Sequence, residues 1–485
     1  MQISITKYRS LNEEFRIDAE YYKPENLTSE SLVTRKPNES LGQLCKIISG
    51  PFGSTVTTEC YVEQKKYRYI RGKDIQNFFI DNTDPVYIGD KLFNTLPQFH
   101  LYPLDILVTV VGMNFGKTAI IFSNDAPAIF SCKSSLIRQS KINVFFLATY
   151  LSCKYGYNLV RRGQRGAAQP GINLFDLQTI PVPLFEKSFL KLIEYLVIQA
   201  REITINSKLK YNEAEQILLA ELNLLDWKPK HNLSFIRNFS DTQKADRIDA
   251  EYFQPMYEEI DRAITSLNKF SNLGDIVSIK KCVEPGSESY QDSGILFLRV
   301  SNLSKFGIKD SNPQYLSESL YKQLSQYQPK KGEILLSKDA TPGIAYYLKD
   351  EPEKMIPSGG ILRLKMNDVE KVCPEYLTLV LNSILVQKQI ERDAGGSIIN
   401  HWLVDQVKNT LIPILSITKQ KEIAQKINAS FCDRELSKNL LEIAKHGVEL
   451  AIEKDENEAE KWINSELKKL NISLEDHDKC PAIEV

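Results

Sequence analysis

The sequence contains no long apolar run and no cluster of cysteine or histidine. None of its 485 residues belongs to a stretch of about 18 consecutive apolar residues, the length needed to span a bilayer. The opening MQISITKYRSLNEEFR also lacks the apolar centre of a secretory signal. The eight cysteines lie singly without C-x-x-C spacing, and there are five histidines. These features argue against a zinc site or disulfide framework, and we expect a soluble cytoplasmic protein that binds no metal and no membrane.

Sequence signatures of catalysis are equally scarce. In GMNFGKTA (112–119), three residues separate Gly112 from Gly116 where a phosphate loop needs four, and the following TAIIF is typical of a strand. We therefore expect a tight turn, with Lys117 facing nucleic-acid phosphates. NPQY (312–315) departs at Gln314 from the Asn-Pro-Pro-aromatic signature of amino-methyltransferases, and no glycine-rich cofactor loop accompanies it. A turn is the simpler interpretation, and we expect no catalytic residue and no cofactor bound by this chain.

The overall composition is that of an ordinary globular protein, with 42% hydrophobic and 25% charged residues. Its length fits about three domains. The net charge of −1 hides an uneven distribution, because residues 40–184 carry 15 Lys/Arg against 9 Asp/Glu, whereas residues 416–485 are acidic. Such asymmetry indicates either separate partners for the two regions or ordinary charge scatter.

A long internal repeat organises the chain. RIDAEY occurs at 16–21 and again at 247–252. Similar segments follow each copy in the same order. These pairs are SLGQLCKIISG and SNLGDIVSIKK, YIRGKDI and FLRVSNL, LDILVTVVG and GEILLSKDA, IFSCKSSLIRQ and MIPSGGILRLK, and GQRGAAQPGINLFDLQTIPVP and AGGSIINHWLVDQVKNTLIPI. We interpret this as duplication of one fold; two unrelated α+β domains sharing a hexapeptide are the alternative.

A helical period follows each β-rich domain. Apolar and small residues recur at alternating steps of three and four, the seam of a coiled coil. They are Ile193, Val197, Ala200, Thr204, Ser207, Tyr211, Ala214 and Leu218 in the first copy, and Ile423, Ile427, Ser430, Leu441, Ala444, Val448 and Ala451 in the second. A helix of about 40 residues reaches about 60 Å. This favours a spacer of two helices paired side by side with the two domains at opposite ends, while packed bundle helices remain the alternative.

The predicted fold class is therefore α+β with a pseudo-twofold internal repeat. The predicted segments are a lead-in and first domain (1–184), a first long helix (185–228), a lead-in and second domain (229–415), a second long helix (416–470) and an acidic tail (471–485). Within RIDAEY, we expect Arg16, Asp18, Arg247 and Asp249 to pair with the helical spacer. Ile17, Tyr21, Ile248 and Tyr252 are expected to pack against it.

Glycine-rich polar loops are the candidate binding sites. Residues 157–173 combine arginines and glutamines with three glycines, and arginine suits guanine edges while glutamine suits adenine edges. The equivalent GGSIINHW (395–402) carries different polar residues, so the two copies would read different DNA sequences; a solvated basic loop without a partner is the alternative. The predicted DNA contacts are Ser54, Arg71, Lys73, Lys117, Lys133, Arg161, Arg162, Gln164, Arg165, Gln169, Arg299, Ser301, Asn302, Lys338, Ser397, Asn400 and His401.

In this order and repeated twice, these segments resemble the specificity subunits of type I restriction-modification systems. The resemblance rests on both RIDAEY lead-ins, on YIRGKDI and FLRVSNL, on PLDILVT and KGEILLS, and on the closing segments before the long helices. It covers nearly the whole chain. One departure lies after the terminal prolines, where only the second copy keeps the family's usual glutamine, at Gln420.

The resemblance implies two target-recognition domains on two long helices that form an antiparallel coiled coil, and it implies that these domains read a bipartite double-stranded DNA sequence in phage defence. It further implies helices that dock two modification subunits, which bind S-adenosylmethionine and methylate adenine, and a complex that can recruit restriction subunits. A recognition component of another DNA-modifying or phage-defence complex, or an enzyme with fused recognition domains, is the alternative function.

Overall fold

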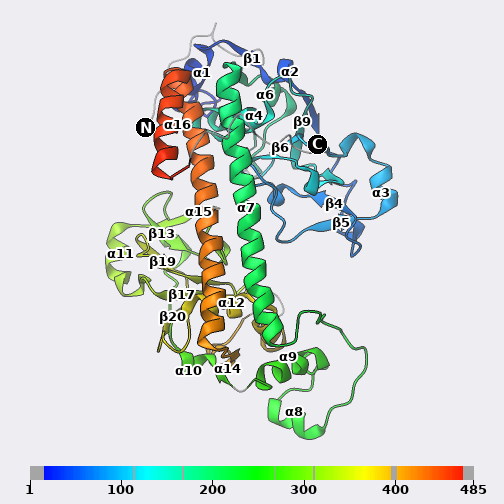
Figure 1. Cartoon of the computed structure of the whole chain (residues 1–485). Helices are drawn as coiled ribbons and strands as arrows, with labels where there is room; N and C mark the ends of the chain where they lie inside the picture. Colours follow the sequence, from blue (N-terminus) through cyan, green and yellow to red (C-terminus); the bar gives the residue numbers. More distant parts are fainter. Residues whose placement is uncertain are drawn as a thin grey trace. The chain divides into compact units, whose positions relative to one another are not determined.

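The computed structural model describes residues 16–112, 115–166, 169–267, 269–309, 312–394 and 401–472 (Figure 1). They form two compact units. The first unit comprises Met1–Thr204 and Glu435–Val485, and the second comprises Ile205–Arg434. Both unit boundaries fall inside long helices, so each unit contains one end of each helix.

The first unit contains three sheets and a set of mostly short helices. Its strands are β1 (Asn38–Ser40), β2 (Lys46–Ser49), β3 (Tyr61–Val62), β4 (Tyr67–Ile70), β5 (Val86–Ile88), β6 (Ile106–Thr109), β7 (Thr118–Ile120), β8 (Ala128–Phe130), β9 (Ser134–Arg138) and β10 (Pro181–Pro183). Its helices are α1 (Pro24–Thr34), α2 (Leu41–Leu44), α3 (Asp90–Asn94), α4 (Val144–Ser152), α5 (Lys154–Arg162), α6 (Leu174–Gln178) and α16 (Glu456–Lys469), with parts of α7 (Lys187–Glu221) and α15 (Ile417–Glu453). The sheet orders are β2-β9-β6-β7, β3-β5-β4-β8 and β1-β10.

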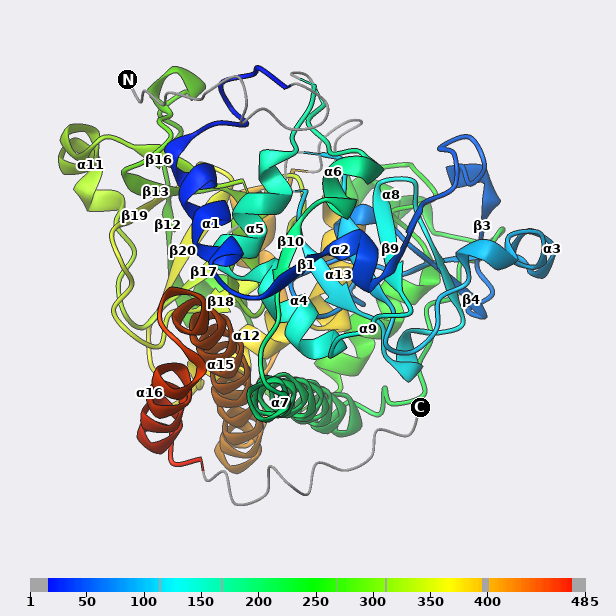
Figure 2. The same cartoon turned by 90° about the horizontal axis from the view of Figure 1, so that it is seen from above.

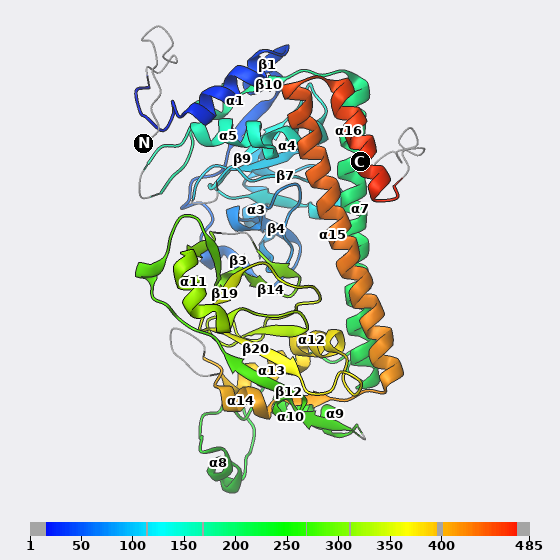
Figure 3. The same ribbon diagram turned by 90° about the vertical axis from the view of Figure 1, so that its left-hand side faces the viewer.

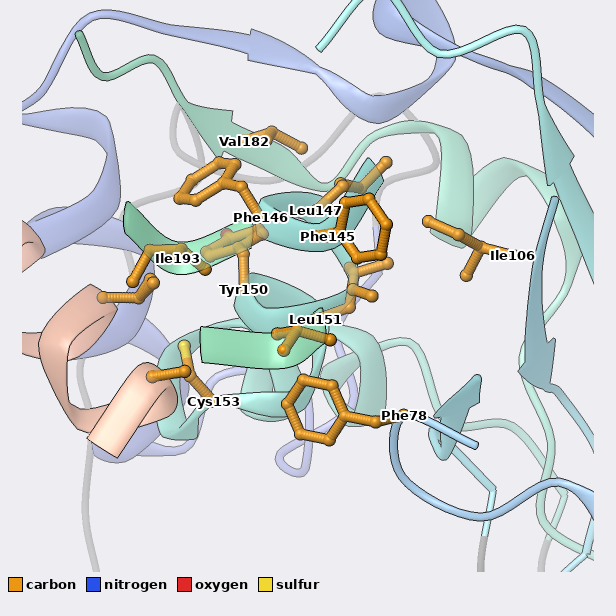
Figure 4. Close-up of a cluster of buried hydrophobic side chains, with 14 of the residues drawn as sticks. Phe78, Ile106, Phe145, Phe146, Leu147, Tyr150, Leu151, Cys153, Val182 and Ile193 are labelled. Atoms are coloured by element: carbon orange, nitrogen blue, oxygen red, sulfur yellow. The ribbon is translucent and has the colours of Figure 1, made fainter. Parts of the chain in front are cut away.

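The core of the first unit is built around α4. Asn143 begins this helix by accepting a hydrogen bond from the Phe146 backbone N–H (3.0 Å), and all residues after Val144 are buried. Figure 4 shows α4 side chains gathered with Ile106 of β6, Val182 of β10 and Ile193 of α7. Burial of such large apolar side chains contributes about 1.5–3 kcal/mol each. The recognition domain and its end of α7 therefore share one core.

The second unit contains a similar set of strands and helices. Its strands are β11 (Phe270–Asn272), β12 (Val277–Lys281), β13 (Ile295–Leu298), β14 (Leu303–Ser304), β15 (Gly307–Ile308), β16 (Gln314–Leu316), β17 (Glu333–Ser337), β18 (Ala345–Tyr347), β19 (Met355–Pro357), β20 (Ile361–Met366) and β21 (Leu411–Pro413). Its helices are α8 (Phe239–Ala245), α9 (Pro255–Thr265), α10 (Leu273–Ile276), α11 (Glu318–Leu324), α12 (Pro374–Asn382), α13 (Ile384–Asp393) and α14 (Val404–Asn409). The remaining parts of α7 and α15 complete it.

The two units repeat one topology, which confirms the predicted duplication. The sheet β2-β9-β6-β7 corresponds to β12-β20-β17-β18, and β1-β10 corresponds to β11-β21. In the third sheet, β4 pairs antiparallel with β5 and parallel with β8; β13 pairs in the same two ways with β16 and β19. Figure 3 shows α1 beside α5 in the first unit, and their equivalents α9 and α13 pack together in the second. Strand β3 is reduced in the second unit to a single bridge between Gln291 and Tyr315, and the β14–β15 hairpin is reduced in the first unit to a bridge between Ile75 and Ile80.

Within each unit, α7 and α15 run antiparallel along the predicted seam. The predicted seam residues are buried, except for Thr204 and Leu441, which are partly buried; Leu440 is buried beside Leu441. The polar middle of the seam is satisfied by hydrogen bonds between helices. Ser207 donates to the Ser430 carbonyl (2.8 Å) in the second unit, and Ser437 donates to the Ala200 carbonyl (2.6 Å) in the first. Small side chains at these positions let the helix backbones approach closely.

The segment 416–470 forms two helices rather than one. The helix α15 ends at Glu453, and Asp455 begins α16 by accepting a hydrogen bond from the Glu458 N–H (2.9 Å). The helix α16 then lies beside α15 (Figure 2), with Ile463 close to Gly447. The physical reason is the apolar stripe Ala459, Ile463 and Leu467, which is buried on the first unit. No helix of the described residues is long and apolar enough to cross a membrane.

Candidate nucleic-acid interface

Five loops meet at one edge of the first unit, which we call the first recognition edge. It comprises residues 50–54, 71–76, 110–117, 131–133 and 164–172, as far as they are described. Backbone hydrogen bonds join these loops: Ser131 N–H donates to the Ile70 carbonyl (3.0 Å), Val110 N–H to Lys133 (2.8 Å), and Gly112 N–H to Pro170 (2.9 Å). Residues far apart in the sequence are thus brought together because the strands before them end at the same edge.

Several predicted DNA contacts lie on this edge with exposed side chains. Ser54 and Lys133 are exposed on neighbouring loops. Arg71 is half-buried and forms ion pairs with Asp74 (2.9 Å) and Asp84 (3.3 Å), and Lys73 pairs with the same Asp84 (2.9 Å). The hydrogen bond from Lys73 lowers the pKa of Asp84 below its ordinary value. The Arg71 and Lys73 cations are therefore partly neutralised within the chain.

The segment around Lys117 forms the connection between strands β6 and β7, as the sequence predicted. Gly112 and Gly116 both adopt positive φ, +113° and +96°, which suits glycine. Thr118–Ile120 is a strand rather than a helix, so the segment is not a phosphate-binding loop. Lys117 Nζ donates to the side-chain oxygen of Gln76 (2.6 Å), which orients the lysine on the edge.

The glycine-rich loop after α5 supplies further polar groups. Arg161 lies over the Phe115 ring (4.6 Å to the centroid) and donates to the Phe115 carbonyl (3.3 Å). Arg165 makes two hydrogen bonds with the carboxylate of Asp176, at 2.9 and 3.0 Å. Gln169 is exposed, and Gln164 is partly exposed. Two of the predicted arginines are thus held at the edge by residues of the chain itself.

Arg162, by contrast, points into the unit. It is 9% exposed, pairs with Glu30 (2.7 Å), and donates to the Tyr21 carbonyl (3.1 Å). Its neighbour Arg161 faces the edge because consecutive residues of a helix lie about 100° apart. The structure therefore separates two arginines that the sequence placed together.

The second unit has an equivalent second recognition edge. It comprises residues 282–290, 299–302, 338–343, 358–360 and 401–402. Ser358 N–H donates to the Leu298 carbonyl (2.9 Å), Lys338 N–H to Gly360 (2.8 Å), and Trp402 N–H to Lys338 (2.8 Å). These bonds join the loops in the same arrangement as in the first unit.

The polar groups on the second edge differ from those on the first. Lys338 and His401 both contact the carboxylate of Asp339, at 2.5 and 2.9 Å. Arg299 donates to the Asn312 carbonyl, and Ser301 is exposed. Asn302 is fully buried and donates to the Lys309 carbonyl (3.3 Å). The predicted contacts Ser397 and Asn400 lie outside the described residues.

The NPQY segment leads into a strand of this unit. Asn312 adopts a positive φ of +48°, and Gln314–Leu316 forms β16, which pairs with β13. The segment is therefore a turn, as predicted, and it is followed directly by a strand. Among the residues that the structure describes, no group of three or more His, Cys, Asp and Glu is placed to hold a metal ion.

The RIDAEY copies do not bind the helical spacer, so the expectation for them was wrong. Arg16 pairs with Asp18 (2.8 Å) and with Asp176 (3.4 Å), and Arg247 pairs with Asp249 (2.8 Å). Tyr21 and Tyr252 lie against arginine side chains of the recognition domains. Ile17 and Ile248 are 84% and 89% exposed. The identity of the two copies singled out the motif in the sequence. Its contacts could not be predicted, because partners such as Asp176 lie about 150 residues away from it along the chain.

Gln420 also has a role that the sequence did not indicate. Its side chain accepts a hydrogen bond from the Cys373 N–H (2.9 Å) and donates to the Lys371 (3.1 Å) and Leu415 (2.9 Å) carbonyls. With 1% exposure, it fixes the start of α15 to the start of α12.

Comparison with known protein families gives a match to the second unit of the chain. Residues 266–444 match the family model of the type I restriction modification DNA specificity domain. The chain carries a type I restriction-modification DNA specificity domain. The match begins just before β11 of the second unit, continues to residue 444 within α15, and confirms the resemblance seen in the sequence.

Solved specificity subunits are similar to this chain at low identity. The S subunit of the type I restriction-modification system from M. genitalium shares 13% identity, with a TM-score of 0.38, over 86% of this chain and 95% of that one. The HsdS subunit from Thermoanaerobacter tengcongensis shares 14% identity, with a TM-score of 0.28, over 86% and 97%. The type IIG restriction endonuclease BpuSI shares 9% identity, with a TM-score of 0.29, over 40% and 30%. No curated protein matches the sequence.

Proposed function

We propose that the chain is the DNA-reading subunit of a type I restriction-modification complex, with each recognition edge contacting one half of a bipartite target. The observation that carries this proposal is the repeat itself. The specificity-domain fold of the second unit recurs element by element in the first, with equivalent loops at an equivalent edge. The scaffold is shared while the polar groups on the edges differ, as two readers of different half-sites require.

The first edge offers cations and amides for direct readout. Arg161 and Arg165 present guanidinium groups of the kind that recognise guanine, and Gln169 presents an exposed amide that suits adenine. Lys117 and Lys133 suit phosphates, which position the protein without specifying a base. Their own partners hold Arg161 and Arg165 in place, and this reduces the conformational entropy lost on binding.

The second edge presents a more mixed set of charges. Lys338, His401 and Asp339 form a connected group of donors and an acceptor, and Ser301 adds an exposed hydroxyl. A carboxylate near the DNA repels phosphate but accepts well from the cytosine amino group. The two edges therefore favour different base sequences.

The chemistry of the complex belongs to partner subunits in this proposal. The long helices dock two modification subunits, which bind S-adenosylmethionine and methylate adenine in each half-site. Restriction subunits join when the complex cleaves DNA. The chain supplies recognition and no catalytic group.

The decisive experiment is coexpression of the chain with its modification subunit, followed by mapping of methylated adenines in genomic DNA. We expect one motif of two short specified halves separated by unspecified bases. A continuous motif, or no methylation by an intact complex, would contradict the proposal.

A double substitution tests the assignment of the first edge. Arg161→Ala with Arg165→Ala should remove discrimination in one half-site only and weaken binding at least 10-fold, since each good base contact is worth about 1–3 kcal/mol. Arg35→Ala with Lys46→Ala is the matched control, because it removes two exposed cations outside the edge. Equal behaviour of the two double variants would remove the loop from the interface. Binding should also weaken steeply as salt rises, because phosphate contacts release counterions.

A further inference from the structure

Each unit contains a tyrosine between two arginines. In the first unit, the ring of Tyr21 lies near the guanidinium groups of Arg16 (4.5 Å to the centroid) and Arg162 (3.9 Å). In the second unit, the ring of Tyr252 lies near those of Arg247 (4.5 Å) and Arg392 (5.9 Å). The first arginine comes from RIDAEY, and the second comes from the last turn of α5 or α13. We call each group an arginine-tyrosine lock.

The carboxylates around the first lock hold its groups in place. Asp18 accepts from the Tyr21 N–H (3.1 Å) and pairs with Arg16 (2.8 Å). Burial raises the pKa of Asp18, but the interactions with Arg16 and the hydrogen bond from the Tyr21 N–H together lower that pKa below its ordinary value. Glu30 on α1 pairs with Arg162 (2.7 Å).

The second lock repeats the same contacts. Asp249 accepts from the Tyr252 N–H (3.1 Å) and pairs with Arg247 (2.8 Å), whose hydrogen bond lowers the pKa of Asp249. Asp261 on α9 pairs with Arg392 (2.6 Å). The two units have diverged around these residues, yet the contacts agree pair by pair.

Both locks are attached where α5 or α13 ends, just before the loop of the recognition edge. Arg16 donates to the Gln164 carbonyl (3.0 Å), and Arg247 donates to the Arg392 carbonyl (3.4 Å). In the first unit, buried Asp176 joins Arg16 to Arg165, which lies on the edge itself. In the first unit, the lead-in is thus a third attachment for a loop that is otherwise held by α5 before it and α6 after it.

We propose that each lock positions one recognition loop, so that the two locks act on the two half-sites separately. This inference rests on the proposed function. The lock residues are positioning residues, because Tyr21 and Arg162 act on DNA only through the loop. A shared need to hold the end of α5 or α13 explains why RIDAEY is identical while the loops differ.

The test compares Tyr21→Leu with Tyr252→Leu in the full chain, using duplexes of the mapped target that carry a base change in one half. The wild type should distinguish each changed base roughly 10- to 100-fold. Tyr21→Leu should lower this discrimination ratio about 10-fold for the half read by the first unit. For the other half, the ratio should stay within about 2-fold of the wild-type value. Tyr252→Leu should have the opposite pattern. Tyr21→Phe, which keeps the ring, should retain discrimination in both halves.

Hydrogen exchange of the free chain gives a readout without DNA. Tyr21→Leu should speed amide exchange in residues 163–173 and leave residues 394–402 unchanged. Arg162→Lys is a milder variant that keeps the charge facing Glu30 and removes the planar guanidinium. If Tyr21→Leu unfolds the first unit, Arg162→Lys takes its place in both measurements.

The outcomes separate the two proposals. A wild-type chain without sequence-specific binding would overturn the proposed function. A specific wild type whose variants still read both halves, or lose both halves equally, would overturn the lock proposal alone.

A different observation, the exposure of apolar residues beside RIDAEY, supports a second inference. Ile17 and Ile248 are the same position of the motif, and both are more than 80% exposed. In the second unit, three further apolar side chains precede the motif on a segment that extends outward around α8 (Figure 1): Leu233, Ile236 and Phe239, at 97%, 96% and 74% exposure. In the second unit, exposed apolar groups gathered in this way are typical of a contact site, and Ile17 is the equivalent exposed residue of the first unit.

A partner that binds this surface must do so once in each unit, next to acidic side chains. The exposed Asp18 and Glu20 flank Ile17, and the exposed Asp249 and Glu251 flank Ile248. Such acidic surroundings repel DNA phosphates and suit a protein surface with apolar and basic groups. A site present once in each unit fits one copy of the same partner per unit.

We propose that Ile17 and Ile248 each contact one modification subunit, which deepens the docking part of the proposed function. Ile17→Asp and Ile248→Asp should each reduce the copurified complex from two modification subunits to one, measured by native mass spectrometry. The double variant should lose both. Val369→Asp is the matched control, because Val369 is also exposed (53%) and lies outside the motif.

Failure of this second inference is distinct from failure of the proposed function. Two bound subunits in every variant would overturn the contact while leaving the complex intact. Loss of DNA binding by the free variants would indicate that these isoleucines contact DNA instead. Dimerisation of the wild-type chain that the double variant abolishes would indicate a second copy as the occupant.

Discussion

The buried ion pair between Glu333 and Arg363 allows a quantitative prediction: breaking it should lower the stability of the second unit without changing DNA recognition. Their side chains are 5% and 3% exposed, and two parallel hydrogen bonds of 2.8 and 3.0 Å join them. Glu333→Gln keeps the shape and removes the charge, which leaves Arg363 buried without its counter-ion. Breaking a buried pair from one side costs about 3–5 kcal/mol, and we expect that loss in the free energy of unfolding of the second unit.

Urea unfolding of the full chain measures this loss. The buried Trp402 reports on the second unit when Trp227 and Trp462 are replaced by phenylalanine. A lower midpoint with an unchanged slope indicates lost stability rather than an altered unfolded state. Half-site discrimination should be unchanged in the folded variant, because Glu333 lies at the other end of β17 from Lys338 on the recognition edge.

Two comparisons can refute this reasoning. Glu333→Leu with Arg363→Leu removes both charges and should recover most of the loss, since apolar replacement of a buried pair is often neutral. Asp105→Asn breaks the corresponding pair of the first unit, where Arg138 is 19% exposed, and should cost less, about 1.5–3 kcal/mol. A loss below about 1 kcal/mol for Glu333→Gln, or a double variant as unstable as the single one, would show that burial does not control the pair.

Two further predictions concern buried groups. Ser207→Val should lower the free energy of unfolding by about 1–3 kcal/mol in urea, because it removes the hydrogen bond to Ser430 and overfills a close helix contact; a stability equal to wild type would argue against that packing. Iodoacetamide at pH 8 should label the exposed Cys432 and spare Cys153, since burial raises the Cys153 thiol pKa to about 12; equal labelling by mass spectrometry would contradict the burial.

Sequence patterns with a fixed period were sufficient to predict the architecture. The seam from Ile193 to Leu218 follows a step of three and four residues that only a helix aligns on one face, and the structure buries it. The strand before Lys338 and its counterpart before Val110 were recognisable because both occur in the same order in each copy. The separation of the second long helix into α15 and α16 falls in the polar run EKDENE (453–458). It was not predicted, because the seven-residue step from Ile452 to Ala459 across this run still fits one continuous helix.

The binding residues were only partly predictable, since local composition cannot tell which side of a helix end faces outward. Arg161 and Arg162 are neighbours of the same type, yet the first lies on the recognition edge and the second faces Glu30 and Tyr21 inside the unit. Asn302 was predicted as a DNA contact and is fully buried. Chemical type was readable from the sequence, whereas orientation depended on how α5 packs against α1.

The sequence by itself determined the duplication, the order of the strands and the helical seam, because these depend on spacing along the chain. Only the tertiary structure decided the partners of RIDAEY. Arg16 meets Gln164 and Asp176 across about 150 residues of sequence, and Ile17 is left exposed. Such contacts arise from the joint packing of α1, α5 and α6, and no local preference of the six residues encodes them.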